Sequence, residues 1–120
     1  LLQAAASRAG AEKEELIEDG CSLPGEVKMA LFRIAQESLH NVVRHAAASQ
    51  IKLEFRCKKG PLQLTIEDDG RGFDQTAVAP GHFGLQIMQE RAAEINAHLS
   101  ISSRVGKGTT VRLIWPQAKV

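Results

Sequence analysis

The stretch that decides the fold is Leu62-Gln63-Leu64-Thr65-Ile66-Glu67-Asp68-Asp69-Gly70-Arg71-Gly72. Its apolar residues alternate with polar ones, which is typical of a strand with one buried face. Asp68 keeps the phase of Leu64 and Ile66, so the pattern predicts that its carboxylate faces the core. An inward acid needs hydrogen-bond donors, and the amino group of a purine base is a suitable one. The alternative is an Asp-Gly turn whose carboxylate caps local amides.

Further strands are expected on both sides of this stretch. Residues 51–57 alternate in the same way, and Lys59-Gly60-Pro61 interrupts the pattern, so a hairpin is expected there. Residues 99–101 and 111–115 predict two more strands, joined by a turn at Gly106-Lys107-Gly108. Thr109 has the phase of the apolar residues of the last strand, so its hydroxyl is predicted to face inward beside Asp68. The alternative is an ordinary threonine at a loop edge.

Apolar spacing predicts the helices. From Val27 to Ala46 the apolar residues recur every three or four positions, as they do on one face of an amphipathic helix. Residues 85–95 carry a second such stripe, residues 1–9 predict a short helix, and residues 11–19 a weak edge strand. The order helix, strand, helix, two strands, helix, two strands indicates an α+β domain, with helices layered on one face of a mixed sheet.

Composition limits the function. The 120 residues fit one domain spanning 1–120, and a formal net charge of +1 argues against direct nucleic-acid binding. No apolar run approaches the ~20 residues of a membrane-spanning helix. Cys21 and Cys57 have no metal-ligand spacing and form no disulfide framework, so they are expected to be reduced cytosolic thiols.

The long helix carries polar residues beside its apolar face. Glu37, Asn41 and Arg44 are spaced i, i+4 and i+7 and therefore share a stripe. A carboxylate and an amide next to a core are costly without partners, and a metal ion with its water would supply them. A solvated helix flank is the alternative.

The residues Gly81-His82-Phe83-Gly84 come just before the second apolar stripe. Free backbone amides and the helix dipole make such a helix start a phosphate site. The sequence is neither a Walker P-loop nor a GxGxxG fingerprint, and alone it is weak support for a nucleotide site.

Taken together, these motifs resemble a known family. Four of them occur in order: Glu37-x-x-x-Asn41-x-x-Arg44-His45, Asp68-x-Gly70-x-Gly72, Gly81-x-x-Gly84-Leu85 and Gly106-x-Gly108-Thr109. They are similar to the N, G1, G2 and G3 boxes of the ATPase superfamily that includes DNA gyrase, heat-shock chaperones, histidine kinases and mismatch-repair proteins. The resemblance covers residues 24–116. Within it, residues 33–39 and 84–92 resemble the nitrate-sensor-like histidine kinases.

The resemblance implies a two-layer α/β sandwich of the Bergerat type, whose mixed, mostly antiparallel sheet has about three helices on one face. It implies the ATP-binding catalytic domain of a two-component sensor histidine kinase. Such a domain transfers the γ-phosphoryl group of ATP to a histidine on a separate dimerisation domain. That domain would precede residues 1–10, and a response regulator with a helix-turn-helix output would act downstream. The parent would be a homodimer, soluble or membrane-anchored, whereas this cytoplasmic domain alone would be a monomer.

The resemblance also assigns roles to residues. Glu37 would be the catalytic residue that orients or deprotonates the attacking group, and Asn41 would ligate Mg²⁺ bridging the phosphates. Asp68 would accept from the adenine amino group, supported by Thr109. The remaining candidates for ATP binding are Arg44, His45, Gly70, Gly72, Gly81, His82, Gly84 and Leu85.

Two other functions remain open from the sequence. One is a protein serine kinase of the anti-sigma-factor type, and the other is a degenerate nucleotide-binding module that regulates a partner. The four histidines lie within or after the N box, so none matches the phosphoacceptor. His40 is expected on the helix surface and His98 at a loop or strand start.

Overall fold

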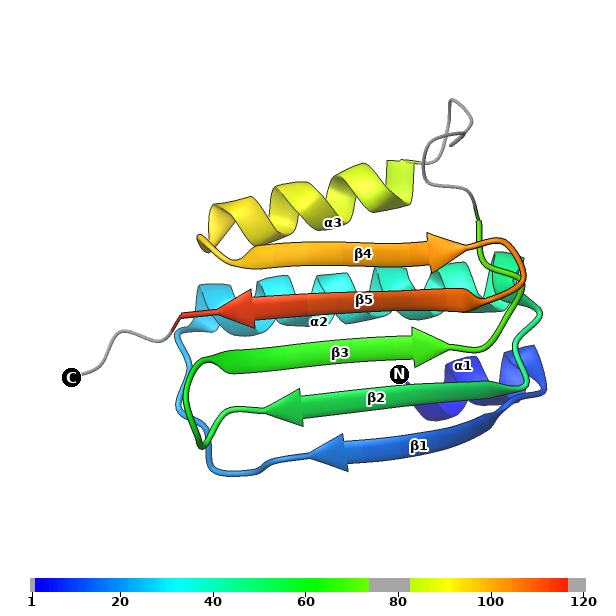
Figure 1. Ribbon diagram of the computed structural model, residues 1–120. Helices are drawn as coiled ribbons and strands as arrows, with labels where there is room; N and C mark the ends of the chain where they lie inside the picture. The colour runs from blue at the N-terminus through cyan, green and yellow to red at the C-terminus, as the bar shows by residue number, and fades with distance from the viewer. Residues whose placement is uncertain (1, 74–82, 117–120) are drawn as a thin grey trace.

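The computed structural model describes residues 2–73 and 83–116, without the side chains of residues 45, 46 and 83. In this part of the chain, five strands form one sheet in the order β1-β2-β3-β5-β4, and three α-helices lie on one face of it (Figure 1). The elements are α1 (Leu2–Ala9), β1 (Glu12–Ile17), α2 (Gly25–Asn41), β2 (Gln50–Arg56), β3 (Leu62–Asp68), α3 (Phe83–Glu94), β4 (His98–Arg104) and β5 (Gly108–Trp115). The predicted two-layer α+β fold is confirmed.

The sheet is mixed because only its edge strand is parallel to its neighbour. β1 pairs with β2 in parallel, and the other three pairings are antiparallel. All six residues of β1 are exposed, including Leu16 and Ile17. The absence of buried side chains explains why the sequence pattern of this strand is weak.

The core lies between the sheet and the helices. Strand alternation turns Ile51, Leu62 and Leu113 toward α2, where all three are fully buried, and Ile34 of α2 is also 0% exposed. Met88 of α3 extends this core with 1% exposure. Full burial of one such side chain stabilises the fold by roughly 1.5–3 kcal/mol.

The predicted helix from Val27 to Ala46 is not one continuous α-helix. The α-helix ends at Asn41, and residues Val42–Ala46 form a π-helical turn, η1, closed by Ala47 in the left-handed conformation with φ 50°. Isolated π-turns often occur at functional sites, because the wider turn re-aims the side chains that it carries. This turn carries Arg44 and His45.

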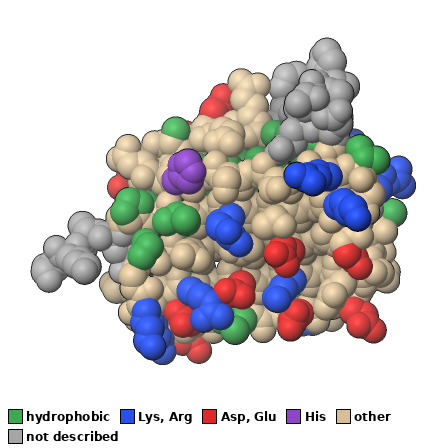
Figure 2. All heavy atoms as spheres, in the orientation of Figure 1, with side chains coloured by type: hydrophobic (Ala, Val, Ile, Leu, Met, Phe, Trp, Pro, Cys, Tyr) green, Lys and Arg blue, Asp and Glu red, His purple; other side chains and the backbone are tan. Residues whose placement is uncertain are grey.

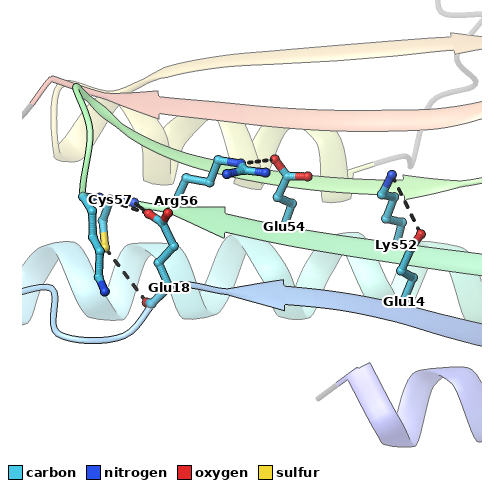
Figure 3. Close-up of polar contacts among 7 residues, drawn as sticks. Glu14, Glu18, Lys52, Glu54, Arg56 and Cys57 are labelled. Atoms are coloured by element: carbon cyan, nitrogen blue, oxygen red, sulfur yellow. Dashed lines mark hydrogen bonds and ion pairs between the residues drawn. The ribbon is translucent and has the colours of Figure 1, made fainter.

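A disulfide links Cys21, in the β1–α2 connection, to Cys57, which follows β2, and their Cα atoms are 6.1 Å apart. The expectation of two reduced thiols is therefore wrong. The carboxylate of Glu18 lies at the same point and accepts hydrogen bonds from the amides of Cys57 (2.6 Å) and Lys58 (3.0 Å) (Figure 3). These two amides are the main reason why the pKa of Glu18 is lowered.

The sheet face opposite the helices is open and carries mixed charges (Figure 2). The pairs Lys52–Glu14 (3.8 Å) and Arg56–Glu54 (2.5 Å) lie on β1 and β2, and exposed pairs of this kind contribute little to stability (Figure 3). Within residues 2–73 and 83–116, no helix is both long enough and apolar enough to span a bilayer.

Candidate functional site

Asp68 and Thr109 face each other on adjacent strands. They are paired in the β3–β5 register, and both are half-buried, as their phase with the neighbouring core residues predicts. Oδ1 of Asp68 accepts a hydrogen bond from the amide of Gly70 at 2.8 Å. Burial raises the pKa of Asp68, with a smaller contribution from the charge of Asp69, while the amides of Gly70 and Thr109 act in the opposite direction. A carboxylate has about four acceptor positions, so two amides leave capacity for a further donor.

The loop after β3 is packed, backbone to backbone, against the β4–β5 turn. Gly72 has φ +63°, and a Cβ there would collide with the carbonyl of Arg104. Gly108 has φ +83°, and a Cβ there would collide with the carbonyl oxygen of Asp68. The amide of Gly106 also donates to the carbonyl of Arg71 at 2.6 Å. Gly72 of the G1 box and Gly108 of the G3 box are therefore required for this close approach.

Ser103 of β4 joins the two motifs, and the sequence reasoning missed it. It is only 8% exposed, and its Oγ lies 2.8 Å from Oγ1 of Thr109. The same Oγ accepts from the amide of Phe73 at 2.9 Å and lies 3.2 Å from the carbonyl oxygen of Gly108. The signal was available, because Ser103 continues the inward phase of Leu99 on β4, just as Thr109 does on β5.

Asp69 is a second acid whose role the sequence reasoning did not identify. Its Oδ1 accepts from the amides of Ser49 (2.8 Å) and Gln50 (2.9 Å), and its Oδ2 accepts from the hydroxyl of Ser49. The Ser49 hydroxyl is the largest cause of the lowered pKa of Asp69. Asp69 therefore fixes the start of β2 and is exposed, whereas the neighbouring Asp68 is turned inward.

Glu37 and Asn41 meet the start of α3. Both side chains are half-buried on α2. Gly84 lies so close to them that a Cβ at this position would contact Oε1 of Glu37 and lie 3.4 Å from Nδ2 of Asn41. The structure therefore brings together the predicted catalytic acid, the predicted metal ligand and the glycine of the G2 box.

Among the other predicted site residues, the structure describes Arg44 and Leu85 with their side chains, but not the side chain of His45 or the residues Gly81 and His82. Arg44 is exposed, with Nη1 3.4 Å from Nε2 of His40, which lies on the helix surface as expected. Leu85 is half-buried and packs against the core. The side chain of His45 and the residues Gly81 and His82 lie outside the described part of the chain.

All of these groups lie at one end of the sheet. The end of α2, the start of α3, the end of β3 and the β4–β5 turn gather at the right of Figure 1. A half-buried acid beside a hydroxyl and an acid–amide pair at a helix start thus occur together in one region. This combination can accept hydrogen bonds from a base and can hold a cation with phosphate groups.

The fold and this site define an ATPase class. The family described as histidine kinase-, DNA gyrase B- and HSP90-like ATPase matches residues 26–119, and the chain belongs to this ATP-using family. Among curated relatives, 38% identity over 100 residues relates it to the signal transduction histidine-protein kinase/phosphatase DegS of Brevibacillus brevis, covering 83% of this chain and 26% of that protein. The sensor histidine kinase LiaS of Bacillus subtilis is 40% identical over 92 residues, covering 74% and 26%.

Solved structures agree with this assignment. The histidine kinase domain of the blue-light activated histidine kinase EL346 of Erythrobacter litoralis superposes with a TM-score of 0.79 at 26% identity, covering 96% of this chain and 60% of that one. The chain spans about a quarter of the length of the two curated relatives named above. Membership of the nitrate-sensor-like branch stays a prediction.

Proposed function

We propose that this chain is the ATP-binding catalytic domain of a two-component sensor histidine kinase. It transfers the γ-phosphoryl group of ATP to a histidine on a separate dimerisation domain. The observation that carries the proposal is the meeting of Glu37, Asn41 and Gly84 at the sheet end where Asp68 faces Thr109. The relatives, which are named as sensor and signal transduction histidine kinases, support it.

In this proposal the base and the phosphates bind at different parts of the site. The carboxylate of Asp68 accepts from the adenine amino group, supported by Thr109, and Gly70 and Gly72 shape the pocket. The start of α3, with Gly84 and Leu85, receives the phosphates, because helix N-termini favour anions. Gly81 is assigned to the same role by its place in the G2 motif of the sequence. The remaining assignments at the phosphate end of the site are Arg44, His45 and His82.

The donor set fits a magnesium ion. Mg²⁺ prefers oxygen ligands and commonly uses one or two protein groups together with substrate phosphates and water. The side-chain amide of Asn41 carries such an oxygen. This side chain is half-buried, and its Nδ2 lies beside the helix start that would receive the phosphates. When bound, the ion would neutralise charge on the phosphates.

Glu37 has the catalytic role. Phosphoryl transfer depends mainly on positioning and electrostatic stabilisation, so a nucleophile within this domain is not required. The carboxylate of Glu37 would orient the incoming imidazole or accept its proton. Its half-buried place against Gly84 limits its mobility and holds it near the phosphate end of the site.

The partners follow from this reaction. The domain works with the phosphoacceptor domain of the same kinase, and a response regulator, with a helix-turn-helix output, receives the phosphoryl group. The parent is a homodimer, the isolated domain is a monomer, and the domain acts in the cytoplasm whether or not the parent is anchored in a membrane.

Nucleotide binding tests the proposal. We expect the chain to bind a non-hydrolysable ATP analogue, and to bind it more tightly with Mg²⁺, in isothermal titration calorimetry. Asp68→Asn should lose roughly ten- to a hundredfold in affinity, because it replaces a charged acceptor. Glu67→Gln, on the opposite face of the same strand, is the matched control and should bind normally. A wild-type chain that binds no better than Asp68→Asn would remove the basis of the assignment.

Phosphoryl transfer tests the catalytic role. Glu37→Gln should keep nucleotide affinity but lose roughly 10²- to 10⁴-fold in transfer to a supplied dimerisation domain, as expected for the loss of a general base. Radiolabelled ATP and quantification of acid-labile phosphohistidine give the rate. Unimpaired transfer would show that Glu37 does not have this role.

A further inference from the structure

The connection from the π-turn to β2 is short. Residues 42–46 form the π-turn, and Ala47 follows in the left-handed conformation. Only Ala48 and Ser49 then remain before β2 begins at Gln50. Ala48 is 5% exposed, so it is packed into the core. The position of Ser49 therefore limits the path that the chain can take as it leaves α2.

Asp69 holds Ser49 in place through its carboxylate. Oδ1 accepts from the amides of Ser49 at 2.8 Å and Gln50 at 2.9 Å, and Oδ2 accepts from the hydroxyl of Ser49. Asp69 follows directly after β3, which lies in the middle of the sheet between β2 and β5 (Figure 1). The carbonyl of Ser49 also accepts from the amide of Glu12 at 2.9 Å, but Glu12 belongs to the edge strand β1, whose side chains are all exposed. Asp69 thus ties Ser49 to the centre of the sheet.

A π-turn depends on what holds the chain after it. Its i→i+5 hydrogen bonds are rare, and the same residues can continue an α-helix when the downstream chain is free. Rewinding residues 42–46 into an α-helix would rotate the side chains that they carry, because the two helices differ in residues per turn. Arg44 is one of these side chains, and Asn41 lies just before the turn. The anchor at Ser49 therefore bears on where Arg44 lies.

We propose that Asp69 is a positioning residue for the phosphate end of the nucleotide site: by holding Ser49, it keeps residues 42–46 in the π-turn and Arg44 in place. The proposal rests on the proposed function, which assigns Arg44 to the phosphate end of the site. Asp69 acts through Ser49 and does not itself contact the nucleotide.

The base end of the site is held independently of Asp69. Asp68 is fixed by its pairing with Thr109 on β5 and by the hydrogen bond from the amide of Gly70. Neither contact involves Ser49 or the π-turn. Loss of the Asp69 carboxylate should therefore affect the binding of phosphates and spare the binding of the base.

The first test compares MgATP with adenosine, which has the same base and no phosphates. Dissociation constants are measured by isothermal titration calorimetry, with adenosine at millimolar concentrations, for the wild-type chain and its variants. We expect Asp69→Ala to weaken MgATP by roughly three- to tenfold, the effect of a lost hydrogen bond, and to leave adenosine unchanged. The control Glu67→Ala removes an acid two residues earlier on the same face of β3 and should bind both ligands normally.

Asp69→Asn separates position from charge. Its Oδ1 can accept from the same two amides, and its Nδ2 can donate to the hydroxyl oxygen of Ser49, so the anchor is kept although the charge is lost. We expect this variant to bind MgATP nearly as the wild type does. An Asp69→Asn variant as weak as Asp69→Ala would overturn the positioning role.

Amide hydrogen exchange followed by NMR tests the turn directly and needs no nucleotide. In Asp69→Ala the amides of residues 43–47 should exchange at least roughly tenfold faster than in the wild type, because the turn has lost its anchor. The amides of Ser49 and Gln50 lose their acceptor in any case, so they do not count. Ser49→Ala loses only the hydroxyl and should give a smaller change in the same direction, which covers the case in which Asp69→Ala folds poorly.

The outcomes distinguish this inference from the proposed function. If the wild-type chain binds no MgATP, the proposed function fails, and the exchange measurement still decides whether Asp69 anchors the turn. If Asp69→Ala weakens MgATP and adenosine by the same factor, or changes neither, the positioning role is overturned while the proposed function stands. Unchanged exchange across residues 43–47 would overturn it as well.

Discussion

Asp68 and Asp69 are neighbours with opposite environments, because successive strand residues face opposite sides of a sheet. Asp68 faces inward, and burial raises its pKa. Asp69 is exposed and bonded to Ser49 and Gln50, which lowers its pKa. The ionised form of Asp69 therefore stabilises the fold above its ordinary pKa, and this contribution is lost as the pH falls through its lowered value. For Asp68 the effect on stability is reversed, so its ionised form destabilises the folded chain near neutral pH.

The raised pKa of Asp68 also predicts a pH dependence of ATP binding. The carboxylate of Asp68 must be ionised to accept from the adenine amino group, so ATP affinity should fall as the pH decreases through its raised pKa, which lies above the ordinary value of 3.8. Calorimetric titrations between about pH 4 and 7.5 measure the fall, which approaches tenfold per pH unit below that pKa. Asp68→Asn is the control, because it lacks the Asp68 carboxylate while the ionisable groups of ATP titrate in the same way.

The same reasoning predicts the stability of that control. Asp68→Asn removes the buried charge and should melt at or above the temperature of the wild type at pH 7, although it binds ATP poorly. A lower melting temperature at pH 7, or parallel pH profiles of affinity for the two proteins, would show that Asp68 does not titrate as its burial implies.

Gly84 tests the contact between α2 and α3. A Cβ there would press on the flexible end of Glu37 and lie 3.4 Å from Nδ2 of Asn41, so Gly84→Ala should displace the Glu37 carboxylate without disturbing the backbone. Alanine is also the better helix former by up to about 1 kcal/mol, so stability should not fall. We expect transfer to a supplied dimerisation domain to drop at least roughly tenfold, since positioning controls the rate.

The control for this change is Gln86→Ala, at an exposed position of the same helix, which should transfer normally. Normal transfer by Gly84→Ala would mean that Glu37 does not need its present position.

At the scale of elements, the sequence predicted the features that follow from the periodic spacing of apolar residues. Alternation along β3 and β5 predicted that Asp68 and Thr109 both face inward. Their direct pairing depends on the strand register, which the structure supplies. The π-turn at Val42–Ala46 was not predictable, since five residues are too few to separate its period from that of an α-helix. Ser103 was overlooked because its inward phase on β4 indicates burial alone, and its hydrogen-bond partners appear only in the structure.

The turn before β5 offers a matched pair of glycines. Gly106 and Gly108 have nearly the same φ, +80° and +83°, but a Cβ at Gly106 meets open space, whereas one at Gly108 meets the carbonyl of Asp68. Gly106→Ala should cost roughly 1 kcal/mol, the penalty of the left-handed conformation. Gly108→Ala should cost clearly more and weaken ATP binding, because the β3–β5 pairing must open beside Asp68.

Chemical denaturation followed by the fluorescence of Trp115 gives both free energies of unfolding. Equal losses for the two variants would show that backbone conformation alone, and not the contact with β3, requires glycine at position 108.

At the scale of the whole molecule, β2 runs from the proposed nucleotide site at one end of the sheet to the disulfide at the other. Its first residues pair with the end of β3 beside Asp68, and its last residues lead to Cys57 at the opposite end of the sheet. The nucleotide site and the disulfide are thus at opposite ends. The pairing of Cys21 with Cys57 could not be predicted from the sequence, because their 36-residue separation is bridged only by the fold.

This separation predicts that the disulfide affects stability but not affinity. Cross-linking residues 36 apart stabilises a chain by roughly 2–4 kcal/mol, mainly through the unfolded state. A reductant should therefore lower the melting temperature of the wild type by about 10 °C. Cys21→Ser should melt near the reduced wild type and should not respond to the reductant.

The dissociation constant for ATP should be the same in oxidised and reduced protein, since the Asp68–Thr109 end contains neither cysteine. A large change in affinity on reduction would mean that the β1–α2 connection controls the nucleotide site across the whole sheet, and the two ends would then have to be treated as one cooperative unit.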